Sequence, residues 1–333
     1  MNKIKFGIIG TNFISDWFCE AAEASGAAQC LCVYSRADET GKAFANKHCI
    51  PHYVTDYASM LDGSVCDIDA VYVASPHMCH MEQSIQAMRA KKHVLVEKPA
   101  ALNAEQFALM QAAAKENGVV LAEAMRPIYD PALELIKTQL PKLGTLRQSF
   151  IDYSQYSSRY DKFLAGTVLN AFKPELSNAA IMDIGVYCFA VAEYLFGEPK
   201  DITAKSVYLN NGFEACGTAI ADYGDQLCQI RYSKVVQSQN VSTIEGEKGT
   251  LYFEAVSKPR NIYIVYRDGR REDVPFTPAE NNMVYEIQAF ARMIAGEASD
   301  TAAQDHTSTV VRMMDASRRS SRVVFPCEQR SNL

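Results

Sequence analysis

The stretch Gly7-Ile-Ile-Gly10-Thr-Asn-Phe-Ile-Ser15 begins in an apolar run and ends in a segment with helical periodicity. The run from Ile4 to Ile9 predicts a buried strand, and the spacing of apolar residues over 13–25 predicts a helix. Gly10 suits a tight turn between the two. A helix that starts directly after a strand offers backbone N–H groups to an anion, so the stretch predicts a strand–turn–helix unit able to hold a pyrophosphate.

The same alternation continues through the first 122 residues. Further strands are expected at 29–34, 70–74, 93–96 and 119–122, and further helices at 40–48, 78–90 and 103–117. Asn103 with Gln106 has the spacing of a capping box, and Gly118 suits the end of that helix. Strands and helices that alternate over short connections imply right-handed βαβ units. We therefore expect an α/β fold, with a doubly wound parallel sheet in a Rossmann domain over residues 1–122.

The pattern changes after residue 122. Helices are expected at 131–139 and 178–195, followed by β-rich runs at 202–209, 217–222, 227–232 and 241–245, and then by helices at 282–295 and 305–320. Turn signals such as Asn211-Gly212 and Asp268-Gly269 separate the runs, which is typical of antiparallel strands. Residues 123–333 should form an α+β domain with an open, mainly antiparallel sheet. A sheet covered on one face suggests a homodimer or a higher oligomer through the other face.

Composition excludes several classes of protein. The 333 residues carry a net charge of -6 without a long basic run, which argues against nucleic acid as a partner. The N-terminus is already strand-like and no apolar stretch is long enough to span a membrane. Ten cysteines are scattered without a CxxC pair or zinc spacing, so we expect reduced thiols, a cytoplasmic protein and no metal.

The match to the GxGxxG dinucleotide fingerprint is incomplete. Asn12 stands at the second glycine, where its tolerance of left-handed φ would help, and Ser15 stands at the third. The second strand ends at Ser35-Arg36, where NAD-binding folds usually place an acid. A hydroxyl and a guanidinium suit a 2′-phosphate, so NADP is favoured over NAD. Asp38, and the alternative that Arg36 stacks on the adenine, keep NAD open.

Glu97-Lys98-Pro99 follows the predicted strand at 93–96, at the edge where open α/β sheets bind ligands. A lysine there can be partly desolvated and used in proton transfer, although a solvated loop lysine would look the same. The strand at 70–74 ends at the same edge in Ser75, Pro76 and His77. His80 could cap the next helix or enter the crevice, and the structural role is favoured.

Asp183 and Tyr187 lie four residues apart on a predicted helix and so share one face. A carboxylate and a phenol aimed at a lysine across a cleft would form a proton-transfer group. The alternative is a helix whose tyrosine packs in the core and whose aspartate makes a surface contact.

Gly7-x-x-Gly10, Glu97-Lys98-Pro99, the Asp183-x-Gly185-x-Tyr187 helix and Glu245-Gly-Glu-Lys-Gly-Thr250 resemble, in order and spacing, the Gfo/Idh/MocA oxidoreductases over essentially the whole chain. The chain has tyrosine at 187, where many members carry histidine, and in this respect it resembles the glucose–fructose oxidoreductase and dimeric dihydrodiol dehydrogenase branch. The resemblance implies NAD(P)-dependent hydride transfer at a carbon of a sugar, polyol or related alcohol. It also implies catalytic roles for Lys98, Asp183 and Tyr187.

The candidate site falls into three groups. Lys98, Asp183 and Tyr187 are the catalytic candidates. The cofactor-binding candidates are Gly10, Thr11, Asn12, Phe13, Ile14, Ser35, Arg36, Ser75, Pro76, His77, His80, Glu97 and Lys98. The substrate-binding candidates are Arg126, Tyr156 and Arg159, the last two from a polar and aromatic segment that would equally suit a dimer contact.

Three alternatives remain open at this point. The chain departs from the glycine-rich stretch of many members at Ser177-Asn-Ala-Ala180, so the substrate is not defined. A trans-dihydrodiol or an imine-like compound is an alternative substrate. A non-catalytic redox sensor on the same fold is the rival class, against which the retention of Lys98, Asp183 and Tyr187 argues.

Overall fold

The computed structural model describes residues 3–325, which fold into two compact units. The first unit runs to Arg126 and takes up residues 279–308 as well, while the second comprises residues 127–278 and the chain from Thr309 onward. This corrects the expected boundary at residue 122, because a segment from the last third of the chain returns to the first unit.

The first unit is built on a six-stranded parallel sheet in the order β3-β2-β1-β4-β5-β6. Its strands are β1 (Ile4–Ile9), β2 (Ala28–Tyr34), β3 (His52–Val54), β4 (Ala70–Val73), β5 (His93–Glu97) and β6 (Leu121–Ala124). The doubly wound sheet is thus confirmed. The sequence analysis missed only β3, whose three residues are too few to show a period.

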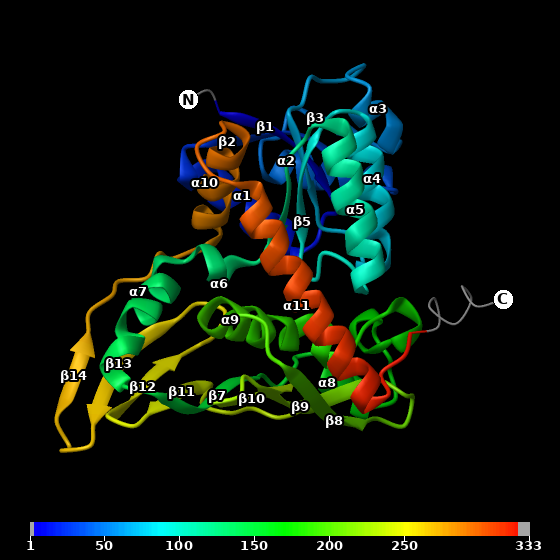
Figure 1. The fold of residues 1–333 in the computed structure, drawn as a ribbon. Coiled ribbons are helices and arrows are strands. Elements are labelled where there is room, and N and C mark those ends of the chain that lie inside the picture. The colour runs from blue at the N-terminus through cyan, green and yellow to red at the C-terminus, as the bar shows by residue number, and fades with distance from the viewer. Residues whose placement is uncertain (1–2, 326–333) are drawn as a thin grey trace. The chain divides into compact units, whose positions relative to one another are not determined.

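Helices cover both faces of this sheet (Figure 1). They are α1 (Phe13–Ser25), α2 (Asp38–Lys47), α3 (Tyr57–Leu61), α4 (His80–Arg89), α5 (Ala104–Asn117) and α10 (Met283–Ile294), with a 3-10 turn η1 (His77–Cys79) before α4. On one face the core contains Met60, Met88 and Phe107 of α3, α4 and α5. At the start of α5, the Asn103 side chain accepts from the Gln106 amide, and Gly118 ends the helix in the left-handed conformation, as predicted.

The other face explains why α10 returns to the first unit. Phe6 of β1 packs edge-on against Phe18 of α1, with ring centroids 5.1 Å apart, and its ring lies tilted against that of Phe290 of α10 at 5.8 Å. Helix α1 alone would leave part of this aromatic face in water. Burial of that apolar area favours the return of α10.

The second unit contains an eight-stranded sheet in the order β14-β13-β12-β11-β7-β10-β9-β8. Its strands are β7 (Leu146–Ser154), β8 (Asp201–Tyr208), β9 (Glu214–Asp222), β10 (Leu227–Ser233), β11 (Val241–Gly246), β12 (Gly249–Glu254), β13 (Arg260–Tyr266) and β14 (Arg271–Val274). Neighbouring strands are antiparallel except for the parallel pair β7 and β10, so the predicted open, mainly antiparallel sheet is confirmed.

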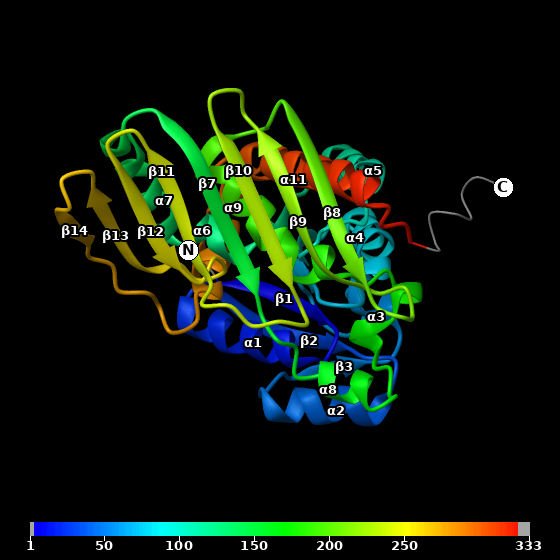
Figure 2. The ribbon, with the colours of Figure 1, turned by 90° about the horizontal axis from the view of Figure 1, so that it is seen from below.

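The remaining helices are α6 (Arg126–Tyr129), α7 (Pro131–Gln139), α8 (Tyr160–Leu164), α9 (Val186–Phe196) and α11 (Asp300–Ser321), with short turns η2 (Leu140–Leu143), η3 (Asn170–Phe172), η4 (Pro174–Leu176) and η5 (Ile181–Gly185). Helix α9 is buried along most of its length and packs against β7 and β10. Figure 2 shows the opposite face of the sheet with no helix in front of it. Val207, Ile220 and Leu227 are exposed on its strands.

Three further properties of the described residues bear on function. None of their helices is long and apolar enough to cross a bilayer. Within residues 3–325, no three His, Cys, Asp or Glu side chains gather where they could hold a metal ion. The nine cysteines of this part of the chain are all free thiols.

Candidate active site

The predicted cofactor residues of the first unit follow the carboxyl ends of adjacent strands. Gly10 follows β1, Ser35 follows β2, Ser75 follows β4, and Lys98 follows β5. The strand order reverses between β1 and β4, and the crevice at such a reversal is where open α/β sheets bind ligands. The topology therefore brings these residues to one edge of the sheet.

The turn from β1 to α1 has no room for a side chain at Gly10. Its φ is +102°, and a Cβ atom there would lie 2.6 Å from the carbonyl oxygen of Ala74. Asn12 has φ -94°, so the left-handed conformation expected of it is wrong. Instead its Oδ1 accepts from the Ile14 amide at 2.9 Å and its Nδ2 donates to the Ala74 carbonyl at 2.8 Å.

Asn12 thus caps α1 and ties the turn to the end of β4, which explains why a second glycine is not needed. Ser15, at the third glycine position, is fully buried against the sheet. The close backbone approach at Gly10 and the positive end of the α1 dipole beside Thr11 and Phe13 fit a dinucleotide pyrophosphate. The residues present therefore fit the cofactor that the fold implies.

Arg36, predicted to select NADP, is exposed beyond the end of β2. Burial raises the pKa of the Cys79 thiol in η1, and the nearby positive charge of Arg36 opposes that rise. The guanidinium therefore lies near the turn that follows β4. Ser35 is used locally, since its hydroxyl donates to the Ala37 carbonyl at 3.0 Å.

His80 lies at the start of α4 and is completely buried. Its Nδ1 is 2.9 Å from the Pro99 carbonyl oxygen and its Nε2 is 2.9 Å from that of Ser75. Burial lowers the pKa of the imidazole, although both carbonyls favour the charged form. The ring therefore links the turn after β4 to the turn after β5, which corresponds to the structural alternative.

Glu97 ends β5 inside the protein. One carboxylate oxygen accepts from the Tyr72 hydroxyl at 2.5 Å and the other accepts from the Lys98 amide at 3.2 Å. Burial raises the pKa of Glu97, while the hydrogen bond from Tyr72 and the charge of Lys98 oppose the rise. Glu97 thus anchors the backbone at the residue that carries the half-buried Lys98.

Two more buried acids near Glu97 were not predicted. Burial raises the pKa of Glu123 on β6 to about 7, and it raises the pKa of Glu286 on α10 well above the usual range. Arg126, predicted to bind substrate, has its guanidinium 5.7 Å from the centre of the Trp17 ring, and its charge opposes the rise at Glu97 and Glu286. The only sequence signal for this group was Glu123 itself, an acid that directly follows the apolar run at 119–122.

In the second unit, Asp183 lies in η5, which is a π-helical turn, and not in the α-helix that the sequence predicted. Tyr187 lies in the first turn of α9, is buried, and contacts the ring of Tyr153 with centroids 5.7 Å apart. The π turn is a frequent feature of functional sites and changes the angle between successive side chains. The structure thus keeps both residues on one continuous helical segment.

Two contacts hold the π turn against the sheet. The buried carboxylate of Glu214 accepts from the Ile181 amide at 2.9 Å, which satisfies one of the unpaired donors at the start of the turn. A Cβ atom on Gly185 would lie 3.0 Å from the Tyr232 ring, so a larger residue there would require the ring or the turn to shift by a few tenths of an ångström. Asp183 itself pairs with Lys234, which the sequence analysis did not single out.

The remaining substrate candidates lie in the segment around α8. The Tyr156 hydroxyl donates to Asp161 at 2.6 Å, and Arg159 is exposed at the start of the helix. Tyr160, next in the chain, stacks against Phe172 with ring centroids 5.8 Å apart.

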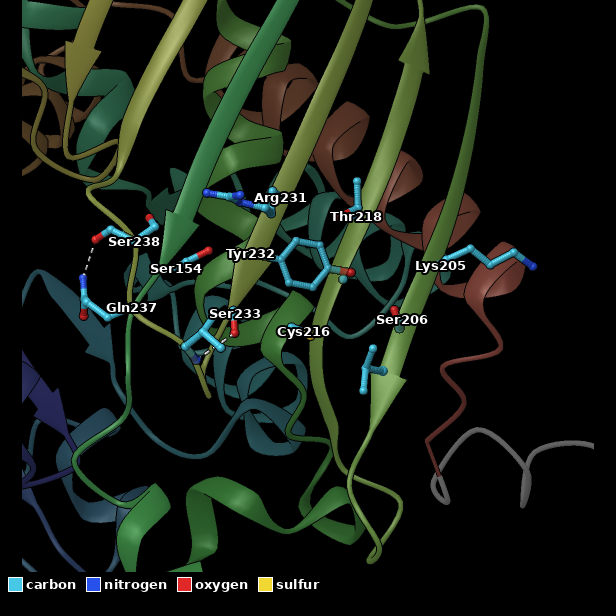
Figure 3. A pocket seen from close by; sticks show the side chains of 13 residues that line it. Ser154, Lys205, Ser206, Cys216, Thr218, Arg231, Tyr232, Ser233, Gln237 and Ser238 are labelled. Carbon is cyan, nitrogen blue, oxygen red and sulfur yellow. Dashed lines mark hydrogen bonds between the residues drawn. The ribbon is translucent and has the colours of Figure 1, made fainter.

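A hollow of about 420 Å³ lies on the open face of the second sheet (Figure 3). Lys205, Thr218 and Arg231 line it, together with Tyr232, whose ring lies beneath Gly217. None of the predicted site residues lines the hollow. It is therefore separate from the candidate active site.

A doubly wound sheet with a glycine turn at its first strand, a lysine at the end of β5 and an aspartate and tyrosine on one helical segment define a dinucleotide-dependent oxidoreductase. Residues 4–125 match the family described as the oxidoreductase family with an NAD-binding Rossmann fold, and residues 141–252 match the GFO/IDH/MocA C-terminal domain. The chain belongs to the Gfo/Idh/MocA oxidoreductase family, and the resemblance drawn from its motifs is confirmed. It is an NAD(P)-dependent oxidoreductase.

Three similar proteins span most of the chain. Scyllo-inositol 2-dehydrogenase (NADP(+)) IolU of Bacillus subtilis (strain 168) is 42% identical over 328 residues, 98% of this chain and 99% of that enzyme. Trans-1,2-dihydrobenzene-1,2-diol dehydrogenase of Xenopus laevis is 29% identical, over 84% of this chain and 83% of that one. The structure of KijD10, a 3-ketoreductase from Actinomadura kijaniata in complex with NADP and TDP-benzene, has the same fold, with a TM-score of 0.85, 24% identity and coverage of 96% of this chain and 98% of that one.

Proposed function

We propose that the protein is an NADP-dependent dehydrogenase that acts on a ring hydroxyl of a polyol of the inositol class. The observation that carries the proposal is the 42% identity, over almost the full length of both chains, to an NADP-dependent scyllo-inositol dehydrogenase. The chain also retains Lys98, Asp183 and Tyr187, which the family resemblance marks as catalytic.

NADP is the proposed cofactor because Arg36 and Ser35 follow β2 where an acid would favour NAD. The residues proposed to hold it are Gly10, Thr11, Asn12, Phe13, Ile14, Ser35, Arg36, Ser75, Pro76, His77, Glu97 and Lys98. His80 acts through the two turns that its ring joins. When bound, the nicotinamide takes up or gives back the hydride.

In the proposed mechanism the chain's own groups handle the proton. During oxidation the phenolate of Tyr187 accepts the proton of the substrate hydroxyl, and during reduction the phenol returns it. The ammonium of Lys98 donates a hydrogen bond to the same substrate oxygen and stabilises the charge that develops there. The carboxylate of Asp183 accepts from a neighbouring substrate hydroxyl and orients the ring. We propose that Arg126, Tyr156 and Arg159 contact the rest of the substrate.

Absorbance at 340 nm, with NADP and NAD each tested against inositols, aldoses and trans-diols, measures the activity directly. We expect turnover with an inositol and NADP. Lys98→Ala should still bind NADP through the remaining cofactor-binding residues, as followed by the emission of Trp17, but lose about 10²–10³-fold in turnover. Near-normal turnover in that variant would overturn the role of Lys98.

The same assay separates the alternatives. Turnover restricted to trans-diols would favour the activity named for the 29% identical relative. NADP binding without turnover of any substrate would instead favour a sensor.

We further propose that the protein is cytoplasmic and forms a homodimer or a higher oligomer through the open face of the second sheet. Val207, Ile220 and Leu227 expose apolar surface there, which a second copy would cover. Leu227→Glu should shift the mass measured by sedimentation toward the monomer. An unchanged mass would contradict the proposed interface.

A further inference from the structure

Lys234 is almost completely buried, with 4% of its surface exposed, although it carries a charge. It directly follows β10, and its backbone N–H donates to the Ala215 carbonyl at 2.9 Å. Burial of an ammonium group is unfavourable unless the charge is paired and its donors are used. The position therefore requires specific partners around the side chain.

Those partners come from three other segments of the second unit. The ammonium lies 2.5 Å from Oδ2 of Asp183 in the π turn and 3.4 Å from the carbonyl oxygen of Ala171 in η3. It also lies 5.2 Å from the centre of the Phe172 ring and 5.6 Å from that of Phe213, within the range of cation–π attraction. One side chain thus joins the end of β10, the η3 segment and the π turn.

The two members of the ion pair differ in accessibility. The Lys234 side chain is 5% exposed, whereas that of Asp183 is 35% exposed. The lysine is therefore held inside, while part of the aspartate faces outward, where a substrate can reach it. Glu214 and Gly185 fix the backbone of the π turn, but Lys234 contacts the carboxylate itself.

We propose that Lys234 is a positioning residue that orients the Asp183 carboxylate. The inference rests on the proposed function, because it takes Asp183 to be the group that orients the substrate hydroxyl. Lys234 acts through Asp183 and through the η3 segment, and does not touch the substrate. Without the ammonium, the carboxylate would lose the ion pair that helps to set its orientation.

Steady-state kinetics of Lys234→Met test this role, because methionine keeps most of the side-chain volume and removes the charge. We expect kcat/KM for the polyol to fall about 10²-fold, as for other small misplacements of reacting groups, with KM for NADP unchanged. Lys234→Arg, which keeps the charge, should recover much of the loss. The double variant Asp183→Asn/Lys234→Met should be no slower than Asp183→Asn alone, since both changes disrupt the same pair of residues.

Urea unfolding of Lys234→Met, Asp183→Asn and the double variant tests the pairing without any substrate. We expect the two changes to be non-additive by at least about fivefold in the unfolding equilibrium constant. Lys142 and Glu272 form a matched control. The charged atoms of this pair are also 2.5 Å apart, but both side chains are about a third or more exposed. Lys142→Met and Glu272→Gln should be nearly additive, and Lys142→Met should leave turnover unchanged.

The outcomes separate this inference from the proposed function. If the wild type oxidises no polyol, the proposed function fails, and the unfolding cycle alone decides whether Lys234 and Asp183 are coupled. If the wild type is active and Lys234→Met is equally active, the positioning role is overturned. The positioning role would also be overturned if Lys234→Met lowers stability while its effect on kcat/KM simply adds to that of Asp183→Asn in the double variant. That is the result expected of an ordinary core contact.

Discussion

The hydroxyl of Tyr72 on β4 donates a 2.5 Å hydrogen bond to the carboxylate of Glu97 on the neighbouring strand β5. The Tyr72 ring is stacked on Phe18 of α1 with centroids 3.7 Å apart. The second oxygen of Glu97 accepts from the Lys98 amide. A path of direct contacts therefore runs from the aromatic core of the first unit to the backbone of Lys98.

Removal of the Tyr72 hydroxyl should loosen this anchor. We expect Tyr72→Phe to lower the free energy of unfolding by ~1–3 kcal/mol in urea, because the buried Glu97 loses a partner. Tyr194→Phe is the control, since it removes a hydroxyl that donates to Glu134 at the surface. Its effect should be well under that of Tyr72→Phe, and equal midpoints for the two variants would count against the anchor.

Glu123 should make stability fall as the pH rises. Its pKa is about 7 in the folded protein against an ordinary value of 4.5, so between these values the folded state holds a proton that the unfolded state has released. Stability is therefore lost from about pH 4.5 to pH 7, by ~3 kcal/mol if this group acts alone. Glu123→Gln should remove that part of the loss, as measured by urea midpoints at pH 5 and pH 8. A variant with an unchanged difference between these midpoints would show that Glu123 is not the group responsible.

Gly10→Ala should impair cofactor binding as well as stability. The added Cβ meets the Ala74 carbonyl at 2.6 Å, so the turn beside the α1 N-terminus must move. Gly26→Ala is the matched control, because Gly26 also has a positive φ but nothing within 4 Å of the new atom. We expect titration of Trp17 emission with NADPH to show a weakened Kd for Gly10→Ala only. Equal affinities in both variants would argue against the turn as the pyrophosphate site.

Arg36→Ala should reduce the preference for NADP. A guanidinium bound to a 2′-phosphate contributes a charge-assisted hydrogen bond of about 1.5–3 kcal/mol, so KM for NADP should rise roughly 10- to 100-fold. KM for NAD should change little, because NAD lacks that phosphate. If both constants rise together, Arg36 stacks on the adenine instead.

Gly185→Ala should slow turnover through the π turn. The new Cβ would press on the Tyr232 ring at 3.0 Å and displace the turn that carries Asp183, so we expect kcat to fall by up to about 10²-fold. Gly197→Ala, at the far end of α9, adds its Cβ to open space and should cost stability without slowing turnover. Similar kcat values for the two variants would contradict this prediction, because they would show that the π turn accommodates the added methyl group without loss of activity.

The elements of the first unit could be predicted because their signals are local. Apolar runs bounded by turn residues indicated five of its six strands, and Asn103 and Gly118 marked the ends of a helix that the structure contains. The π turn could not be predicted, because an α-helix and a π turn share the same apolar pattern. The close contact of Gly185 with Tyr232 and the cap from Glu214 distinguish them, and both partners are more than 30 residues away.

The residues of the candidate site can likewise be divided into those that the sequence predicts and those that only the structure reveals. The positions of Gly10, Lys98, Asp183 and Tyr187 follow from motifs that the sequence alone displays, and so does the chain's membership of an NAD(P)-dependent oxidoreductase family. Only the tertiary structure decided that α10 joins the first unit, that Glu123 and Glu286 lie buried near Glu97, and that Lys234 pairs with Asp183. Periodicity and capping act between near neighbours, whereas burial of an aromatic face or of a charge depends on which distant segments supply the partners.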